Sequence, residues 1–273
     1  MNRRPSRAAR LLTELGVTLA LVLVLFPFVW ILATSLKPAE LVADPGRWVF
    51  APTLDHWREV LLRSEVPRNI LNSLIVGLST VGIALLVGCP AAYALSRSRR
   101  SGPLRFSILS AEMMPPAILI LPFFLLFYRL GLIDSLAGVV VTHLTLVVPV
   151  VTWFLIGFFD AVPRELEEQA RIDGCSVFGA FFRILLPTIR PGLGAAAVFG
   201  FVLSWNDLFY ALILTGGESR TLPVAIAGFW TFRGIEMGKM AVAILLAVVP
   251  VLTLSFFVQK HLVRGLGGGA VKM

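Results

Sequence analysis

Long apolar runs dominate this sequence and limit most strongly what it can fold into. Several windows of about 20 residues carry almost no charge, and each is long enough to cross a membrane as a helix. The chain has 273 residues, of which 57% are hydrophobic and 15% are charged. That charge is too sparse for the surface of a soluble domain of this length. We therefore expect a single α-helical membrane domain that has the lipid bilayer as a partner.

Six spans account for the apolar runs. The first run follows four arginines, as in a signal peptide, but it is longer than the apolar part of such a signal and no small-residue cleavage site closes it. We therefore expect an uncleaved first span. The predicted fold class is all-α, a polytopic membrane protein with six transmembrane helices in one domain, residues 1–273. The predicted spans are residues 11–36, 70–95, 106–128, 136–159, 191–214 and 240–258.

The distribution of charge between the spans predicts the orientation. Lys and Arg gather at the N-terminus, at the turn 97–105 and in the C-terminal tail, whereas the loops 37–69 and 215–239 mix both signs. Cytoplasmic loops are rich in Lys and Arg. We therefore expect a multi-pass protein of the bacterial cytoplasmic membrane with both termini in the cytoplasm and those two loops outside. The net charge of +8 is explained in this way and does not indicate a nucleic-acid partner.

One polar segment, residues 160–190, lies between two apolar spans on the predicted cytoplasmic side. Pro163 and the acidic residues after it are typical of a helix start. Gly174 is suited to end that helix in a left-handed turn, and Ser176 can cap a second helix. The second helix is predicted to carry one apolar stripe. The stripe consists of Val177, Phe178, Phe181, Phe182 and Leu185.

Two interpretations of this helix–glycine–helix segment are open on physical grounds. It could be a connector at the membrane surface that covers the end of the helix bundle. It could instead dock onto a cytoplasmic protein, because its first helix has too little apolar surface to lie in lipid. Residue spacing alone does not identify such a protein.

The segment resembles the E-A-A loop in the permease subunits of bacterial ABC importers. That pattern reads E-A-A, three residues, G, nine residues and I-x-L-P. The chain has Glu168-Gln169-Ala170, Gly174 and Ile184 to Pro187 at those spacings, with Gln169 as the one departure. Further motifs look like the MalG-like branch of carbohydrate (maltose/trehalose-type) permeases, within the family of binding-protein-dependent transport system inner membrane components. They are Asn72-Ser73, Ala91 to Ala94, Trp205-Asn206-Asp207 and Gly265 to Met273.

The resemblance implies a type I ABC importer permease fold in which residues 160–190 act as a coupling loop. Glu168 would make a polar contact with a separate ATP-hydrolysing subunit, Ala170 would allow its close approach, and Gly174 would supply the turn. Gln169, Asp173 and Pro187 belong to the same implied docking site. The C-terminal tail would also reach toward the ATPase subunits. Its contact residues would be Gly267, Gly268, Gly269, Ala270, Val271 and Lys272.

The resemblance also implies partners and a mechanism. This permease would pair with a second, homologous permease above two ATP-binding subunits, and an external solute-binding protein would deliver a sugar. The loop 215–239 would reach into that protein, and transport would proceed by alternating access. The chain itself contains no G-x-x-x-x-G-K-[ST] sequence, so we expect no ATPase activity and no bound cofactor in it. ATP and Mg would be used by the partner ATPase.

Polar residues within the predicted spans are candidates for the solute path. Asp207 lies about halfway along span 191–214, where a charge costs roughly 2.5–3.5 kcal/mol and usually faces a cavity or a partner. It could form an interhelical hydrogen bond, or it could line a sugar path with Asn206 while Trp205 stacks on a sugar face. Asn72 is a further path candidate, for which we favour a structural role. The three histidines are scattered, so we expect no metal site.

Each alternative function would require different sequence features. A glycerol phosphate, a polyamine or another small solute could be imported on the same scaffold, but a phosphate would need cationic groups in the path, and no span has Lys or Arg at its middle. A secondary transporter would need internal repeats and a coupling-ion site. A membrane enzyme would need a convergent catalytic set. The sequence shows no internal repeats, no coupling-ion site and no convergent catalytic set.

Overall fold

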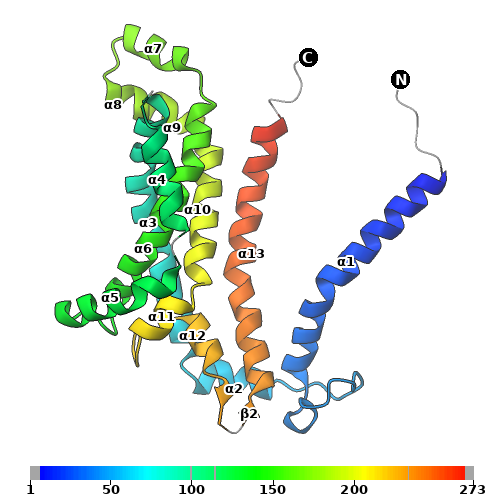
Figure 1. Ribbon diagram of the computed structural model, residues 1–273. Helices are drawn as coiled ribbons and strands as arrows, with labels where there is room; N and C mark the ends of the chain where they lie inside the picture. Colours follow the sequence, from blue (N-terminus) through cyan, green and yellow to red (C-terminus); the bar gives the residue numbers. More distant parts are fainter. Residues whose placement is uncertain (1–6, 99, 114, 233, 268–273) are drawn as a thin grey trace. The chain divides into compact units, whose positions relative to one another are not determined.

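The computed structural model describes residues 7–98, 100–113, 115–232 and 234–267, and it is mostly helical (Figure 1). The described chain divides into two compact units. Unit 1 holds the residues up to Pro67 together with Ile226–Val249, and unit 2 holds Arg68–Ala225 and the residues from Pro250 onward. Each unit is described separately.

Unit 1 combines a long apolar helix with most of the loop 37–69 and with the second part of the loop 215–239, from Ile226 onward. Helix α1 packs against the short helix α2, and Lys37, just after α1, donates a hydrogen bond from Nζ to the carbonyl of Asp44 at 2.8 Å. The elements of this unit are α1 (Arg7–Leu36), the 3-10 turn Ala39–Leu41, α2 (Asp55–Arg63), β1 (Trp230–Thr231), β2 (Gly234–Ile235) and the first half of α13 (Met237–Gly267).

Two short strands, β1 and β2, accompany the predicted helices. They pair antiparallel, with Trp230 opposite Ile235 and Thr231 opposite Gly234. Gly234 has a φ of 113°, which a residue with a side chain rarely adopts. Strands of two residues are too short to produce an alternating apolar pattern, so the sequence did not reveal them.

Unit 2 is a helical bundle built around α6. Helix α6 packs against α10 and α4, and the apolar core lies between α3, α6, α10 and the π-helical turn. Close packing of α10 on α6 requires glycine, because a Cβ on Gly200 would lie 2.9 Å from Val147 and one on Gly192 would lie 2.5 Å from Phe158. The elements are α3 (Val66–Arg97), α4 (Gly102–Glu112), α5 (Pro116–Leu130), α6 (Leu136–Asp160), α7 (Arg164–Ile172), α8 (Val177–Ala180), the π-helical turn Phe181–Leu185, α9 (Leu186–Thr188), α10 (Arg190–Trp205), α11 (Phe209–Leu214) and α12 (Leu222–Ala227).

The predicted helical, polytopic architecture is confirmed. Among the described residues, four helices are long and apolar enough to cross a membrane, and a fifth candidate is the pair Val177–Thr188 and Arg190–Trp205, which is bent by 76°. The four are Leu11–Leu36, Val66–Arg97, Leu136–Asp160 and Met237–Phe256.

Two of the six predicted spans consist of two helices each. Predicted span 106–128 is divided into α4 and α5, because Pro115 and Pro116 lack backbone donors and Pro115 has an extended ψ of 126°. Predicted span 191–214 is divided into α10 and α11. Pro187 does not end the helix pair at this point: it fits the first turn of α9, and the bend follows at Ile189.

Candidate functional site

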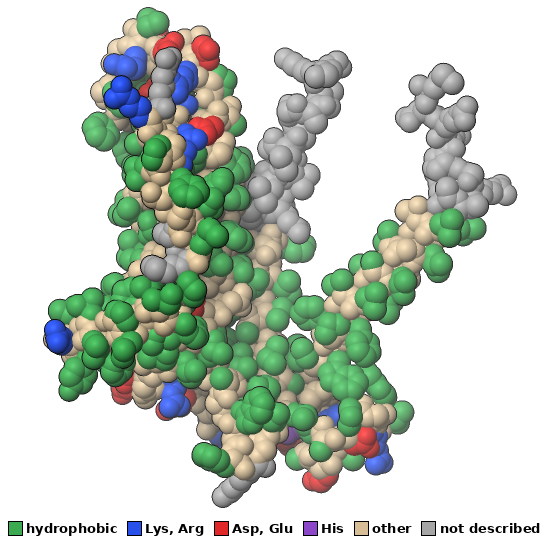
Figure 2. Space-filling model, viewed as in Figure 1, with side chains coloured by type: hydrophobic (Ala, Val, Ile, Leu, Met, Phe, Trp, Pro, Cys, Tyr) green, Lys and Arg blue, Asp and Glu red, His purple; other side chains and the backbone are tan. Residues whose placement is uncertain are grey.

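The predicted coupling loop 160–190 forms one end of unit 2, at the end of the bundle opposite α5 and α11 (Figure 1). Its local structure confirms the predicted helix, glycine turn and helix. Pro163 immediately precedes α7, Gly174 has a φ of 86°, and the Ser176 hydroxyl accepts a hydrogen bond from the Gly179 N–H at 3.1 Å. Charged side chains gather at this end, whereas apolar side chains cover the visible flank of the bundle (Figure 2).

Helix α7 has an outer and an inner face. Glu168, Gln169, Asp173 and Gly174 are exposed, so these residues of the motif are available to a partner. Ala170 is different, because it is only 2% exposed and lies on the face that packs against the chain itself. In the structure, the close approach that its small side chain allows is made within this chain, so the predicted contact of Ala170 with another subunit has no exposed side chain behind it.

The second helix of the loop does not carry one apolar stripe, as predicted, but two apolar faces. Phe181 and Leu185 are buried in the bundle, whereas Val177, Phe178 and Phe182 are exposed. Phe182 points about 100° away from Phe181 around the helix axis, and this places it off the face that packs on the bundle. The exposed set adds apolar surface to the outside of the loop.

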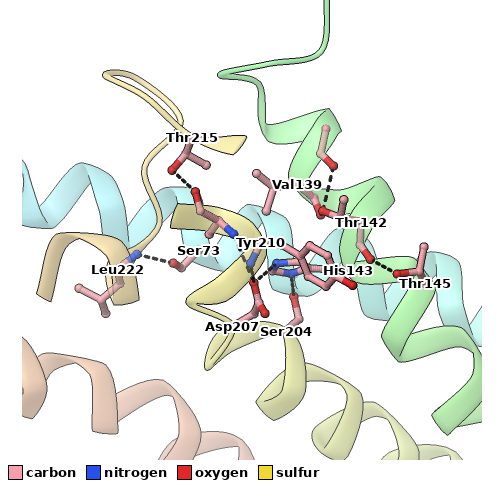
Figure 3. Close-up of polar contacts among 12 residues, drawn as sticks. Ser73, Val139, Thr142, His143, Thr145, Ser204, Asp207, Tyr210, Thr215 and Leu222 are labelled. Atoms are coloured by element: carbon pink, nitrogen blue, oxygen red, sulfur yellow. Dashed lines mark hydrogen bonds and ion pairs between the residues drawn. The ribbon is translucent and has the colours of Figure 1, made fainter. Parts of the chain in front are cut away.

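A buried polar cluster lies where α10 ends (Figure 3). The His143 side chain, 1% exposed, contacts Ser204 Oγ through Nδ1 at 2.7 Å and Asp207 Oδ1 through Nε2 at 3.1 Å. The same Asp207 oxygen accepts hydrogen bonds from the N–H groups of Tyr210 and Ala211 at 3.1 and 3.4 Å. A carboxylate at the start of α11 satisfies donors that the helix break leaves free.

The three predicted path residues at the end of α10 have different environments. Asp207 lies in a helix break instead of within a continuous span, and its side chain is 11% exposed. Asn206 beside it is exposed. Trp205 is only 3% exposed and its ring stacks on Phe201 at 5.4 Å between centroids, so in this conformation the indole faces the core.

Asn72 binds the backbone of the loop that follows α11. Its side chain is 6% exposed, and Nδ2 donates to the carbonyls of Glu218 and Arg220, both at 2.9 Å. The neighbouring Ser73 hydroxyl accepts a hydrogen bond from the Leu222 N–H at 2.7 Å. The start of α3 therefore holds the first part of the loop that follows α11.

Asp134, which sequence reasoning missed, holds the same loop from the link between α5 and α6. Its Oδ1 accepts hydrogen bonds from the N–H groups of Gly216 and Ser219 at 2.8 and 3.2 Å, and Oδ2 accepts one from the Gly217 N–H at 3.1 Å. The Ser219 hydroxyl, followed by the Gly216 N–H, lowers the pKa of Asp134 to about 2. We call Asp134 and the residues 216–219 the loop clasp.

Two residue types in the loop clasp are typical of turns and could be recognised in the sequence. Asp134 has a φ of 54°, in a region that Asp tolerates better than most residues. A Cβ on Gly216 would lie 2.9 Å from Asp134 Oδ2, so the glycine is needed for the contact. A turn could have been inferred from Asp134 and from the Gly216-Gly217 pair, but their association over 82 residues could not.

The predicted contact residues of the C-terminal tail lie at or beyond the end of the described chain. Gly267 is the last residue of α13, and Gly268, Gly269, Ala270, Val271 and Lys272 lie outside the described residues. Within the part of the chain that the structure describes, no group of three or more His, Cys, Asp or Glu side chains could hold a metal ion.

The helical bundle of unit 2 and the helix pair α7 and α8 at its charged end are the features of a polytopic helical permease. The chain belongs to the family described as "Binding-protein-dependent transport system inner membrane component", which matches residues 84–268. It is therefore a permease of a binding-protein-dependent ABC importer in the inner membrane.

Relatives and solved structures agree with this family. The chain is 34% identical over 260 residues to the trehalose transport system permease protein SugB of Mycobacterium tuberculosis, which covers 93% of this chain and 95% of that protein. It is 30% identical over 273 residues to the trehalose/maltose transport system permease protein MalG of Thermococcus litoralis, with 96% and 97% covered. A chain in the crystal structure of a bacterial ABC transporter involved in the import of the acidic polysaccharide alginate shares the fold, with a TM-score of 0.74, 21% identity and coverage of 95% and 99%.

Proposed function

We propose that this permease imports a sugar and that the outer face of α7 docks onto a separate ATPase subunit. In the complete importer, a second homologous permease pairs with this chain, and two ATP-binding subunits use ATP and Mg to drive alternating access. Both termini and α7 lie on the cytoplasmic side, and the loops 37–69 and 215–239 lie outside. The C-terminal tail from Gly267 to Lys272 reaches the ATPase subunits.

The observation that carries the docking proposal is the mixture of side chains on the outside of the coupling loop. Glu168 and Asp173 are exposed there, as are the apolar side chains of Ile172, at 84%, and Phe178, at 77%. Ile172 on α7 and Phe178 on α8 are large apolar side chains beside exposed charged ones, and such a mixture suits a protein partner better than water.

An exchange of Ile172 for aspartate tests this docking. Ile172→Asp changes a side chain that this chain does not bury, so the permease should still insert and pair, while ATPase subunits should copurify at least about tenfold less. Leu62→Asp on α2 is the matched control, because Leu62 is 79% exposed and lies on a predicted external loop. Unchanged copurification with Ile172→Asp would contradict the proposal.

Sugar as the solute is supported by the names of the relatives and by the polar cluster. SugB and MalG are named for trehalose or maltose transport. We propose that Asn206 and Asp207 line the solute path, because Asn206 is exposed and Asp207 is 11% exposed beside it. Amide and carboxylate groups of this kind bind hydroxyl groups through hydrogen bonds.

The class of solute is tested with the reconstituted importer. Solute-binding protein loaded with trehalose or maltose should stimulate the ATPase activity, and the same protein offered glycerol phosphate or a polyamine should not. Stimulation only by a phosphate or a polyamine would replace sugar with the rival solute on the same scaffold.

The hairpin of β1 and β2 supports the proposed contact with the external binding protein. It lies in loop 215–239, where Trp230 is 73% exposed and Phe232 is fully exposed. Aromatic side chains are enriched in the buried centres of protein interfaces. The hairpin would therefore offer the binding protein an apolar tip.

A further inference from the structure

Glu167, the residue before the docking motif, has a different environment from Glu168. Its side chain is 15% exposed, and its Oε2 accepts a hydrogen bond from Arg97 Nε at 2.9 Å. Its Oε1 accepts a second hydrogen bond from the Tyr93 hydroxyl. Both carboxylate oxygens of Glu167 are therefore used by the last turns of α3.

Arg97 extends this contact to a third helix. Its Nη1 donates to the carbonyl of Phe159, near the end of α6, at 3.2 Å, and both Nη atoms approach the carbonyl of Val162 at 3.4 Å. The Arg97 side chain is only 16% exposed. One guanidinium therefore joins α3, the end of α6 and the inner face of α7, and no charge-neutral side chain could make all of these contacts.

The ring of Tyr93 connects the same contact to the apolar core. It lies 5.6 Å from the ring of Phe159 and 5.1 Å from that of Phe181, between ring centroids. Phe181 opens the π-helical turn against which α7 packs. Polar and aromatic contacts thus fix α7 to the bundle at one place.

Such a connection resists separation. Pulling Glu167 away from Arg97 would leave two charges without partners in a largely buried place, which costs far more than an exposed ion pair. A force applied to α7 is therefore expected to move the ends of α3 and α6 with it instead of opening a gap between them.

We propose that Glu167, Arg97 and Tyr93 are positioning residues that transmit the movement of α7 to α3 and α6; we call them the transmission cluster. The proposal rests on the docking of an ATPase subunit at the outer face of α7. In this arrangement two adjacent glutamates have different roles. Glu168 faces the partner, and Glu167 faces the helices that must move.

The test uses the whole importer in proteoliposomes and measures solute transported per ATP hydrolysed. Glu167→Gln preserves the shape of the side chain but removes its charge, and Tyr93→Phe removes one hydroxyl while the ring remains. We expect transport per ATP to fall about tenfold with Glu167→Gln and about threefold with Tyr93→Phe, while copurification of the ATPase subunits and basal ATPase activity are unchanged.

Asp160→Asn is the matched control. Asp160 pairs with Arg105 at 2.8 Å at the same end of the bundle, but this pair joins α6 to α4 and does not include α7. We expect this variant to retain the normal ratio of transport to ATP hydrolysis.

Two results would overturn the proposal. The first is an assembled Glu167→Gln importer that transports the normal amount of solute per ATP. The second is loss of the ATPase subunits from both variants, because the cluster would then be a static brace for the docking surface. Failure of the docking proposal itself would be recognised separately, in the Ile172→Asp variant.

Discussion

At the α7 end of unit 2 a largely buried ion pair joins helices, whereas at the opposite end Asp134 and Asn72 hold the backbone of one loop. Arg97 and Glu167 join two helices through their side chains. Asp134 instead gathers the N–H groups of a loop, and Asn72 holds two carbonyls of the same loop. A pair of side chains connects elements that are already rigid, so they can move as a body. A side chain bound to several backbone groups orders a segment that has no helix of its own.

The comparison gives each end a mechanical role. Helix α7 is regular and needs only attachment, which the transmission cluster supplies. The residues 215–221 have no regular structure, so their order depends on the loop clasp and on Asn72. We therefore expect changes at the α7 end to alter coupling and stability, and changes at the other end to alter local order.

The largest expected effect is that of Arg97→Met on stability. This change leaves Glu167 and the carbonyl of Val162 without their charged partner, and loss of one member of a buried pair costs about 3 kcal/mol. The melting temperature of the purified importer should fall clearly. Arg100→Met is the control, since Arg100 is exposed three residues further on and should leave the melting temperature unchanged. Equal melting temperatures for the two variants would contradict the claim that Arg97 stabilises the attachment of α7 to the bundle.

The loop clasp is tested by Asp134→Asn. Asparagine tolerates the same backbone conformation but offers one acceptor oxygen and no charge. Hydrogen exchange at the backbone of residues 216–219 should accelerate about tenfold. Asp173→Asn at the α7 end should leave that exchange unchanged. If the loop keeps its protection without the carboxylate, Asp134 does not order it.

The polar cluster at the end of α10 is tested by His143→Phe. The change removes the hydrogen-bonding nitrogens and leaves Asp207 and Ser204 without this contact. The KM for transport should rise about tenfold, because Asp207 would no longer be held beside the path. Thr152→Val on the same helix is the control, since the Thr152 hydroxyl donates to the Val148 carbonyl of its own helix at 2.7 Å and lies outside the cluster. An unchanged KM with His143→Phe would return Asp207 to a purely structural role.

The smallest expected effect is the pH dependence of the loop clasp. The pKa of Asp134 lies at about 2, below its ordinary value of 3.8, so the contribution of this carboxylate to stability is complete above about pH 4 and is lost as the pH falls through 2. Protection of residues 216–219, corrected for intrinsic exchange, should therefore be constant from pH 8 to pH 5. A midpoint within that range would show that another group governs the loop.

The helices that build the bundle and the turn at Gly174 could be predicted from the sequence. Apolar runs predict spans because the requirement is local, and the spacing from Glu168 to Pro187 also lies within one segment. The division of span 106–128 has a local signal in Pro115-Pro116, because two adjacent prolines remove backbone donors and can break a helix. The break at Asp207 had a weaker signal, an Asn-Asp pair within an apolar run.

Contacts between distant residues could not be predicted in this way. His143 and Asp207 are 64 residues apart, and Arg97 and Glu167 are 70 apart, and no local pattern selects one partner from the many charged or polar residues. The inner face of α7 had a local clue, however. Glu167 and Ala170 are three residues apart, as expected for one face of a helix, and the small Ala170 marks the side that packs closely.

The most direct test of the account compares Glu167→Gln with Glu168→Gln in the same assembled importer. The variants make the same chemical change at adjacent positions, one on the inner and one on the outer face of α7. We predict that Glu168→Gln weakens the association with the ATPase subunits, and that Glu167→Gln preserves it but lowers the solute transported per ATP. The same defect in both variants, or none in either, would contradict the division of α7 into a docking face and a transmission face.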